Sequence, residues 1–343
     1  MSDLSINNIT DRTGDSGPVI AGVSTVTSTG AFTVPVGPTE MRGGRGRMVM
    51  AGGYGDSPLN AAQTTIQYLT IATTGNSNDF GDLSEGRYVP AACASSTRGI
   101  VAGGDGSPGS AKSSIDYVTI STTGGASTFG SLSVANGYPV GLSDSTRGII
   151  AGGNTPGMSN LIEYVTIAST GDISDFGDLT IGKGNCAACA SPTRGIVFGG
   201  QRPSDSRDEI EYITIATRGD SKDFGSLQNG SRQGAGFSNT TRGIHAGGIT
   251  PTFYNVISYI TIATFGDATD FGDLSAGAGW QSSGASSTRG VMAGQYAPGT
   301  PGATNTIDYV TIASAGNATD FGDVTGPALI GAGGLTDVHG GLG

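Results

Sequence analysis

A unit of about fifty residues recurs along the chain, and this repetition restricts the possible folds more than any other feature of the sequence. One copy runs from Thr97 to Leu132. Three residues mark every copy: an arginine before a Gly-rich apolar run, a tyrosine in an Ile/Val run, and a phenylalanine before glycine. These markers are Arg47, Arg98, Arg147, Arg194, Arg242 and Arg289; Tyr68, Tyr117, Tyr164, Tyr212, Tyr259 and Tyr309; and Phe80, Phe129, Phe176, Phe224, Phe271 and Phe321. All three series keep one register, so the chain contains six copies.

Each copy is expected to form four short strands. In the second copy they are a small-residue strand, an Arg-Gly-Ile-Val strand, an Ile-Asp-Tyr-Val strand and a Phe-Gly strand, at Val89–Ala94, Arg98–Gly104, Ile115–Ile120 and around Phe129–Leu132. Glycine supplies 61 of the 343 residues, which suits tight turns between strands. The third strand is apolar on both faces and must therefore be covered on both sides. Small residues in the first strand suit a crowded innermost position.

These features predict an all-β fold, a six-bladed β-propeller over residues 47–343 with repeats starting near 47, 98, 147, 194, 242 and 289. The segment Ala328–Leu335 resembles another innermost strand but has no repeat after it. The first copy lacks such a strand. Residues 325–343 are therefore expected to supply the strand that closes the ring.

Residues 1–46 lie outside the repeats. Val19–Thr27 and Ala31–Val36 read as two β segments around a hairpin turn at Ser28–Gly30. We expect an N-terminal β arm that attaches the propeller to another protein; the alternative is a partly ordered terminus.

The repeat resembles known families. The order of features in each copy is similar to the kelch repeat: an arginine followed by alanines, then a Gly-Gly strand, a tyrosine and an aromatic residue. In this chain the aromatic residue is phenylalanine, where the kelch family usually has tryptophan. The phrase from Ile307 to Val324 resembles repeats in virion and tail proteins of tailed phages, including phages of aquatic bacteria and cyanobacteria. Val26–Pro35 is similar to segments that precede such repeats.

The resemblance implies a virion structural protein of the tail, baseplate or capsid surface. Such a protein is expected in several copies per particle, with the arm on other virion proteins and a possible host-surface glycan or protein as partner. A cellular kelch-like protein-interaction module remains the alternative. The net charge of −11 disfavours nucleic acid, and no apolar run is long enough for membrane insertion.

Few residues offer catalytic chemistry. The two histidines, His245 and His339, occur in unrelated contexts, and His245 occupies the strand position of Val101. Cys186 and Cys189 have CxxC spacing, but residues three apart in a strand point to opposite faces. No enzymatic activity and no metal site are expected here.

One acidic segment could either bind calcium or form a turn. Gly171–Asp178 contains Asp172, Asp175 and Asp178, and calcium favours such oxygen-rich loops. Aspartate after glycine is also a common turn residue, and the second copy lacks these carboxylates. Turn formation is the preferred interpretation; no cofactor is expected, with calcium the open alternative.

The marker residues Arg98, Arg147, Arg194, Arg242 and Arg289, with Tyr117 and Phe129, are interpreted as structural. The arginines are expected to pair with aspartates such as Asp79 or Asp175. The loops between the second and third strands share neither length nor sequence, which is typical of a binding face. Their candidate binding residues are Tyr54, Arg202, Arg207, Phe253, Tyr254 and Tyr296. The alternative is that these loops are simply unconstrained.

Overall fold

The computed structural model describes residues 46–55, 61–107, 109–203, 205–297, 302–326 and 329–342. The chain divides into two units, residues 1–39 and 40–343, and every described residue belongs to the second. The predicted β arm therefore lies outside the described residues, except for Gly46. The described part is all-β, with one short 3-10 helix, η1 (Gly340–Leu342).

Six antiparallel sheets have four strands each, and we number them by the copy that supplies the marker arginine. Sheet 1 contains β29 (Gly333–Thr336), β1 (Arg47–Ala51), β4 (Thr65–Thr70) and β5 (Asn78–Asp82); sheet 2 contains β6 (Ala91–Ala94), β7 (Arg98–Ala102), β10 (Ser114–Thr119) and β11 (Ser127–Ser131). Sheet 3 contains β12 (Val140–Ser143), β13 (Arg147–Ala151), β14 (Leu161–Thr166) and β15 (Ser174–Asp178); sheet 4 contains β16 (Ala187–Ala190), β17 (Arg194–Phe198), β18 (Glu209–Thr214) and β19 (Lys222–Ser226).

Sheet 5 contains β20 (Ala235–Ser238), β21 (Arg242–Ala246), β22 (Val256–Thr261) and β23 (Thr269–Asp273); sheet 6 contains β24 (Ser282–Ala285), β25 (Arg289–Tyr296), β26 (Ala303–Thr311) and β27 (Thr319–Asp323). Two small sheets lie in the loops: β28 (Leu329–Ile330) with β2 (Tyr54–Gly55) and β3 (Ala61–Ala62), and β8 (Asp105–Gly106) with β9 (Ser110–Ala111).

The last strand of the chain lies in the first sheet. β29 pairs with β1, so that Thr336 is opposite Met48 and Gly333 is opposite Ala51. The sequence placed this strand in Ala328–Leu335. The structure begins it later, because Leu329–Ile330 pairs with β2 in a separate small sheet.

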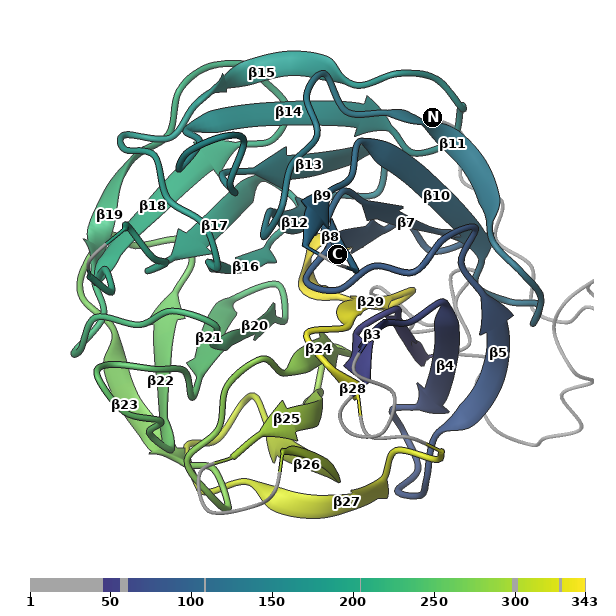
Figure 1. The fold of residues 1–343 in the computed structure, drawn as a ribbon. Coiled ribbons are helices and arrows are strands. Elements are labelled where there is room, and N and C mark those ends of the chain that lie inside the picture. The colour runs from purple at the N-terminus through teal and green to yellow at the C-terminus, as the bar shows by residue number, and fades with distance from the viewer. Residues whose placement is uncertain are drawn as a thin grey trace, which may run out of the picture. The chain divides into compact units, whose positions relative to one another are not determined.

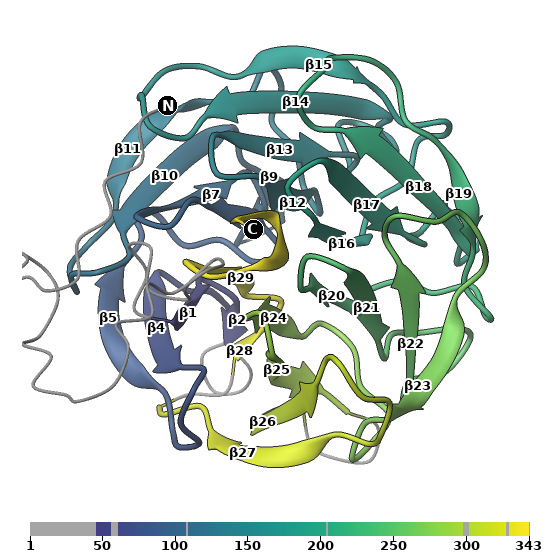
Figure 2. The same ribbon diagram turned by 180° about the vertical axis from the view of Figure 1, so that it is seen from behind.

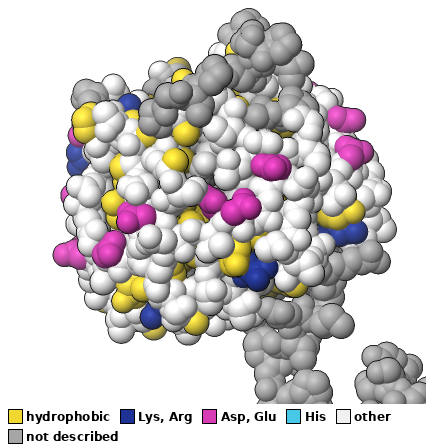
Figure 3. All heavy atoms as spheres, turned by 90° about the horizontal axis from the view of Figure 1, so that it is seen from below, with side chains coloured by type: hydrophobic (Ala, Val, Ile, Leu, Met, Phe, Trp, Pro, Cys, Tyr) yellow, Lys and Arg dark blue, Asp and Glu magenta, His cyan; other side chains and the backbone are white. Residues whose placement is uncertain are grey.

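The innermost strands contact one another in the order β6, β12, β16, β20, β24, β29 and back to β6. Figures 1 and 2 show these strands around the centre of the unit and β5, β11, β15, β19, β23 and β27 at its periphery. Four-stranded antiparallel sheets in this arrangement are consistent with a β-propeller. On the side that Figure 3 shows, acidic side chains are spread among uncharged ones, in keeping with the net charge of −11.

The apolar core lies between neighbouring sheets. Ile115 packs in one cluster with Ile150 and Val165 of sheet 3. Val118, three residues later, packs in another with Val49 of sheet 1. The prediction that the third strand is covered on both faces is confirmed, and it explains why apolar residues follow one another there.

Glycines in the second strands admit side chains from the neighbouring sheet. A Cβ at Gly148 would lie 2.6 Å from Cys93 Sγ, and one at Gly195 would lie 2.6 Å from a methyl carbon of Leu142. Gly99, Gly243 and Gly290 have the same relation to Leu335, Cys189 and Phe237. At these five interfaces a side chain of one sheet's inner strand packs against a glycine of the next sheet.

This relation is reversed between sheets 6 and 1. Met48 occupies the glycine position, and Gly284 occupies the position of the facing side chain. A Cβ at Gly284 would lie 2.9 Å from Met48 Cγ and 2.3 Å from Thr336 Cγ2. The counterpart of Thr336 in sheet 3 is Ser143, which lacks that methyl group. Gly284 is therefore required by both neighbours.

We expect Gly284→Cys alone to destabilise the protein by overpacking, by about 1–3 kcal/mol. Combining it with Met48→Gly and Thr336→Ser recreates the arrangement of Cys93, Gly148 and Ser143. The triple variant should recover most of the lost stability, as measured by urea unfolding. Purely additive effects of the three substitutions would contradict this account of the junction.

Candidate functional site

The three marker residues of each copy meet in one cluster. In sheet 2 the Arg98 guanidinium carbon lies 4.5 Å from the Tyr117 ring centroid, and Tyr117 meets Phe129 edge-on at 6.2 Å. The other five sheets repeat this arrangement, with arginine-to-tyrosine distances of 4.4–5.2 Å. The three sequence markers of each copy are therefore parts of one cluster.

Each marker arginine also reaches the next sheet. Arg98 Nη1 donates a hydrogen bond of 2.9 Å to the carbonyl oxygen of Ile167 at the end of the third strand of sheet 3. The remaining bonds join Arg47 to Ile120, Arg147 to Ile215, Arg194 to Ile262, Arg242 to Ile312 and Arg289 to Ile71, at 2.8–3.0 Å. The series runs through all six sheets and returns to the first.

The expected pairing of these arginines with aspartates is wrong. Asp79 and Asp175 are exposed, and among the described residues no ion pair joins a marker arginine to a carboxylate. The half-buried guanidinium lies flat on its tyrosine and reaches the main chain across the sheet interface. The sequence could not show this acceptor, since every residue carries a carbonyl group.

The acidic segment connects the outer strands. Asp172 Oδ1 accepts a hydrogen bond of 3.0 Å from the Ser131 amide of the preceding sheet. Asp220 and Asp267 accept equivalent bonds, and so do the amide oxygens of Asn317 and Asn76. Since asparagine replaces aspartate in two copies, the oxygen and not its charge is required. The acidic segment therefore has a structural role, in which the side-chain oxygen bonds to the neighbouring sheet and not to its own turn. The described residues contain no cluster of three or more His, Cys, Asp or Glu suited to a metal ion.

The six candidate loop residues have different surroundings. Phe253 and Tyr296 pack together at 5.4 Å. Tyr54 packs edge-on against Tyr88, which the sequence analysis did not single out. Arg207 is paired with Asp205 at 2.7 Å and with Glu209. Burial raises the pKa of Tyr254 to about 12. Arg202 is exposed.

These loops surround one end of the central channel. Backbone bridges join the residue after each Gly-Gly step, or its equivalent, to the residue three positions before the inner strand of the same sheet. The bridges are Tyr88–Asp105, Gly137–Asn154, Gly184–Gln201, Arg232–Ile249, Gly279–Tyr296 and Ile330–Tyr54. The variable loops are therefore held at the channel mouth.

A ring of left-handed residues follows these bridges. The next residue in each copy has a φ between 47° and 63°, and the six are Val89, Tyr138, Asn185, Gln233, Trp280 and Gly331. Five backbone hydrogen bonds of 2.6–3.1 Å connect them, from Val89 N to Gly331 O and onward through Trp280, Gln233, Asn185 and Tyr138. Residues other than glycine rarely adopt this backbone conformation, and such strained positions cluster at functional sites.

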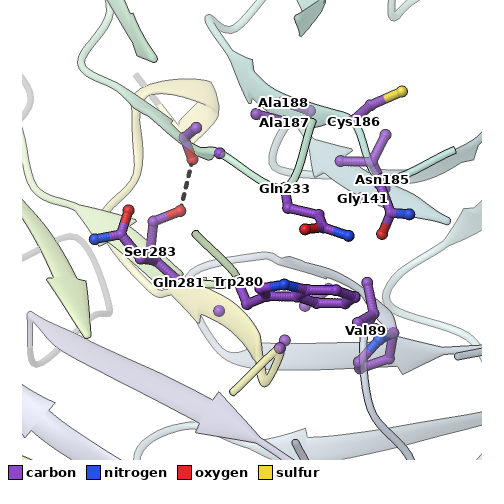
Figure 4. A pocket seen from close by; sticks show the side chains of 18 of the residues that line it. Val89, Gly141, Asn185, Cys186, Ala187, Ala188, Gln233, Trp280, Gln281 and Ser283 are labelled. Atoms are coloured by element: carbon purple, nitrogen blue, oxygen red, sulfur yellow. Dashed lines mark hydrogen bonds between the residues drawn. The ribbon is translucent and has the colours of Figure 1, made fainter. Parts of the chain in front are cut away.

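A cavity of about 110 Å³ opens inside this ring. Asn185 and Gln281, 7% and 9% exposed, line it together with half-buried Gln233 and Trp280. The side-chain oxygens of Asn185, Gln233 and Gln281 accept no hydrogen bond within the described part of the chain. In Figure 4 the Gln233 amide lies over the Trp280 indole, and the Asn185 amide lies on the same side of the ring.

The sequence analysis missed this site because the six ring positions share no residue type. Their common property is a backbone angle. Comparing the position before each small-residue strand would have found them, and Trp280 is the only tryptophan of the chain.

The C-terminal segment lies at the other end of the channel, where η1 contacts β12, β16 and β20. A second cavity of about 70 Å³ shares six small residues with the first, namely Ala92, Gly141, Ala188, Gly236, Ser283 and Gly334. His339 lines its far end and donates from Nε2 to the Ala94 carbonyl oxygen at 2.8 Å, while Nδ1 accepts from the Gly341 amide at 3.1 Å. Gly341 packs so closely that a Cβ there would lie 1.9 Å from Ser143 O.

The histidines and cysteines occupy separate structural positions. His245 is 2% exposed in β21 and packs on Phe198 at 5.8 Å, far along the chain from His339 in the closing segment. All three cysteines are free. Burial raises the pKa of Cys186 to about 11 and that of Cys189 to about 12, which opposes nucleophilic or metal-binding thiolates.

Replacing Arg98 by methionine retains an apolar stem but removes the stacked cation and the bond to Ile167. We expect a loss of about 2 kcal/mol in the free energy of unfolding, measured with urea. The matched control is Arg202→Met, which changes an exposed loop arginine. Equal unfolding midpoints for the two variants would contradict the structural role of the marker arginines.

Stability should depend on the protonation of His245. Burial lowers its pKa from 6.5 to about 4, so the unfolded chain binds a proton at higher pH than the folded chain. Stability is therefore lost as the pH falls from 6.5 toward 4, by about 3 kcal/mol for this group. His245→Val, which places the residue of Val101 at this position, should remove that part of the acid sensitivity. Parallel stability–pH curves for the two proteins would refute the prediction.

No family model matches this sequence, and no curated protein is significantly similar to it. None of the described segments forms a helix suited to crossing a bilayer. Functional interpretation therefore depends on the channel, the ring around its mouth and the loops that surround it.

Proposed function

We propose that residues 47–343 form a closed, six-bladed, kelch-like β-propeller that serves as a non-enzymatic structural component of a phage virion, in the tail, baseplate or capsid surface. The observation that carries the proposal is the cycle of arginine bonds between sheets, from Arg47 to Ile120 and finally from Arg289 to Ile71. A cycle of this kind fixes every sheet against two neighbours. It suits a rigid scaffold that displays loops.

The binding surface would be the channel mouth with its variable loops. They belong to six different copies and lie at one end of the channel, where their sequences can diverge without disturbing the sheets. Residues 1–46 would attach the propeller to other virion proteins, and several copies would be present in each particle. The resemblance of the repeat phrase to phage virion and tail proteins supports this setting.

The surroundings of the titratable side chains support a non-enzymatic role. His245 is buried beside Phe198, and His339 holds the closing segment against Ala94. Arg207 is engaged by two carboxylates. Each of these groups has a structural partner that accounts for its position.

The proposal is tested on virions purified from the source phage, by mass spectrometry and cryo-electron microscopy. We expect the chain among the particle proteins and a ring of six four-stranded sheets with the loop face directed outward. Density with the loops buried against neighbours would make the protein an assembly component without host contact. Its absence from particles would overturn the virion setting and favour a cellular interaction module.

A further inference from the structure

We propose that the cavity inside the left-handed ring binds one neutral pyranose residue at the exposed end of a glycan. Its ring face would lie on Trp280, and its hydroxyl groups would donate to Asn185 and Gln233. This inference rests on the binding role proposed above and assigns a ligand class to it. It follows from the hydrogen-bonding groups, the aromatic surface, the charge and the depth of the cavity.

The hydrogen-bonding groups require a ligand that donates. Asn185 Nδ2 already donates to Gln201 Oε1 at 3.2 Å, which leaves the Asn185 carbonyl oxygen free. Gln233 Oε1 is also without a partner among the described residues. Buried acceptors are normally satisfied, and unsatisfied ones at a cavity need a specific explanation. Two unpartnered acceptors beside one cavity suit a ligand that carries at least two hydroxyl donors.

Trp280 offers the apolar surface that a sugar ring requires. The axial hydrogens of a pyranose form an apolar face, whereas its hydroxyl groups project from the rim. The indole is held in position by its backbone, because Trp280 N donates to Gln233 O and Trp280 O accepts from Gly331 N, both at 2.8 Å. In Figure 4 the amides of Asn185 and Gln233 lie on the same side of the indole. A ligand stacked there would meet both acceptors.

Charge and depth restrict the ligand further. No charged side chain is among the described residues that line the cavity, so an ionised ligand would have no partner for its charge. Below the cavity lie the six small residues shared with the second, smaller cavity, which His339 lines. A glycan that enters from the channel mouth would therefore go in by its end. The site would select a neutral terminal residue.

The full-length protein reports binding directly, because Trp280 is its only tryptophan. We titrate it with methyl glycosides of neutral hexoses while recording tryptophan emission. We expect a saturable change with a dissociation constant of roughly millimolar magnitude, as is reasonable for a single small ligand. Oligosaccharides that carry the same residue at the end or in the interior distinguish glycan-end recognition from binding of free sugar alone.

Gly331, the ring residue before β29, shows which matched variants to use. Gly331 occupies the ring position equivalent to Asn185 and Gln233, so Asn185→Gly and Gln233→Gly remove an amide while suiting the left-handed backbone. Each should weaken binding by about tenfold. The control is Tyr138→Gly, the same backbone change at a ring position whose side chain does not line the cavity. It should bind as the unaltered protein does.

Three results would overturn the inference: no saturable change with any neutral glycoside, unaltered binding by both amide variants, or tighter binding of an anionic glycoside such as a glucuronide. Trp280→Phe, followed by calorimetry, gives a readout independent of fluorescence and should also weaken binding. If no neutral sugar binds but the protein is present in virions, the proposed structural role stands. Sugar binding by a protein absent from virions would overturn the virion setting alone.

Discussion

The contact of each marker arginine with two sheets is the interaction on which the rest of the structure depends. The guanidinium stacks on a tyrosine of its own sheet and donates to a main-chain carbonyl of the next. A hydrogen bond from a charged group is worth about 1.5–3 kcal/mol, and stacking on an aromatic ring adds to it. The same residue thus orders the interior of one sheet and fixes the approach of its neighbour. The Arg289–Ile71 bond joins residues 218 positions apart and connects the last sheet to the first.

The structural period is two copies, although the sequence period is one. Side chains at the third position of the inner strands alternate between small and large, in the order Cys93, Leu142, Cys189, Phe237, Gly284 and Leu335. The next position alternates as well. Ser143, Ser238 and Thr336 donate to the carbonyl oxygens of Ala94, Ala190 and Ala285. Identical copies would place equal side chains against one another at the crowded centre, so alternation relieves a packing conflict.

Buried ion pairs involve third-strand carboxylates of sheets 2 and 4. Arg87, fully buried, lies 3.4 Å from Asp116 of sheet 2, and Lys183 lies 2.8 Å from Glu211 of sheet 4. Burial alone would raise the pKa of Glu211, but Lys183 and hydrogen bonds from Ser221 and Thr180 lower it on balance. The corresponding Asp308 of sheet 6 has a hydrogen bond from Ser275, and burial raises its pKa. Glu211 is thus stabilised in the charged form and Asp308 is not.

The sequence predicted the all-β class, the strands of each copy and the strand at the C-terminus because these follow from apolar periodicity and register. It assigned the wrong partners to the arginines, because charge suggests a carboxylate whereas the observed acceptor is a main-chain oxygen that no residue type signals. The eighteen marker residues were recognisable because they recur in every copy, and the six loop residues because the loops diverge. The left-handed ring was not, since Asn185, Gln233 and Trp280 share only a backbone conformation.

That ring explains how a repeated scaffold can carry a site that is not repeated. Its backbone hydrogen bonds connect the copies whatever side chain is present, and Gly331 shows that the conformation does not need one. The packing between sheets is determined elsewhere, by the marker clusters and the inner strands. The residues at the six ring positions are therefore free of the constraints that make the copies alike, and Val89, Asn185, Gln233 and Trp280 line the cavity at the channel mouth. Divergence at these positions changes the chemistry of the mouth without changing the fold.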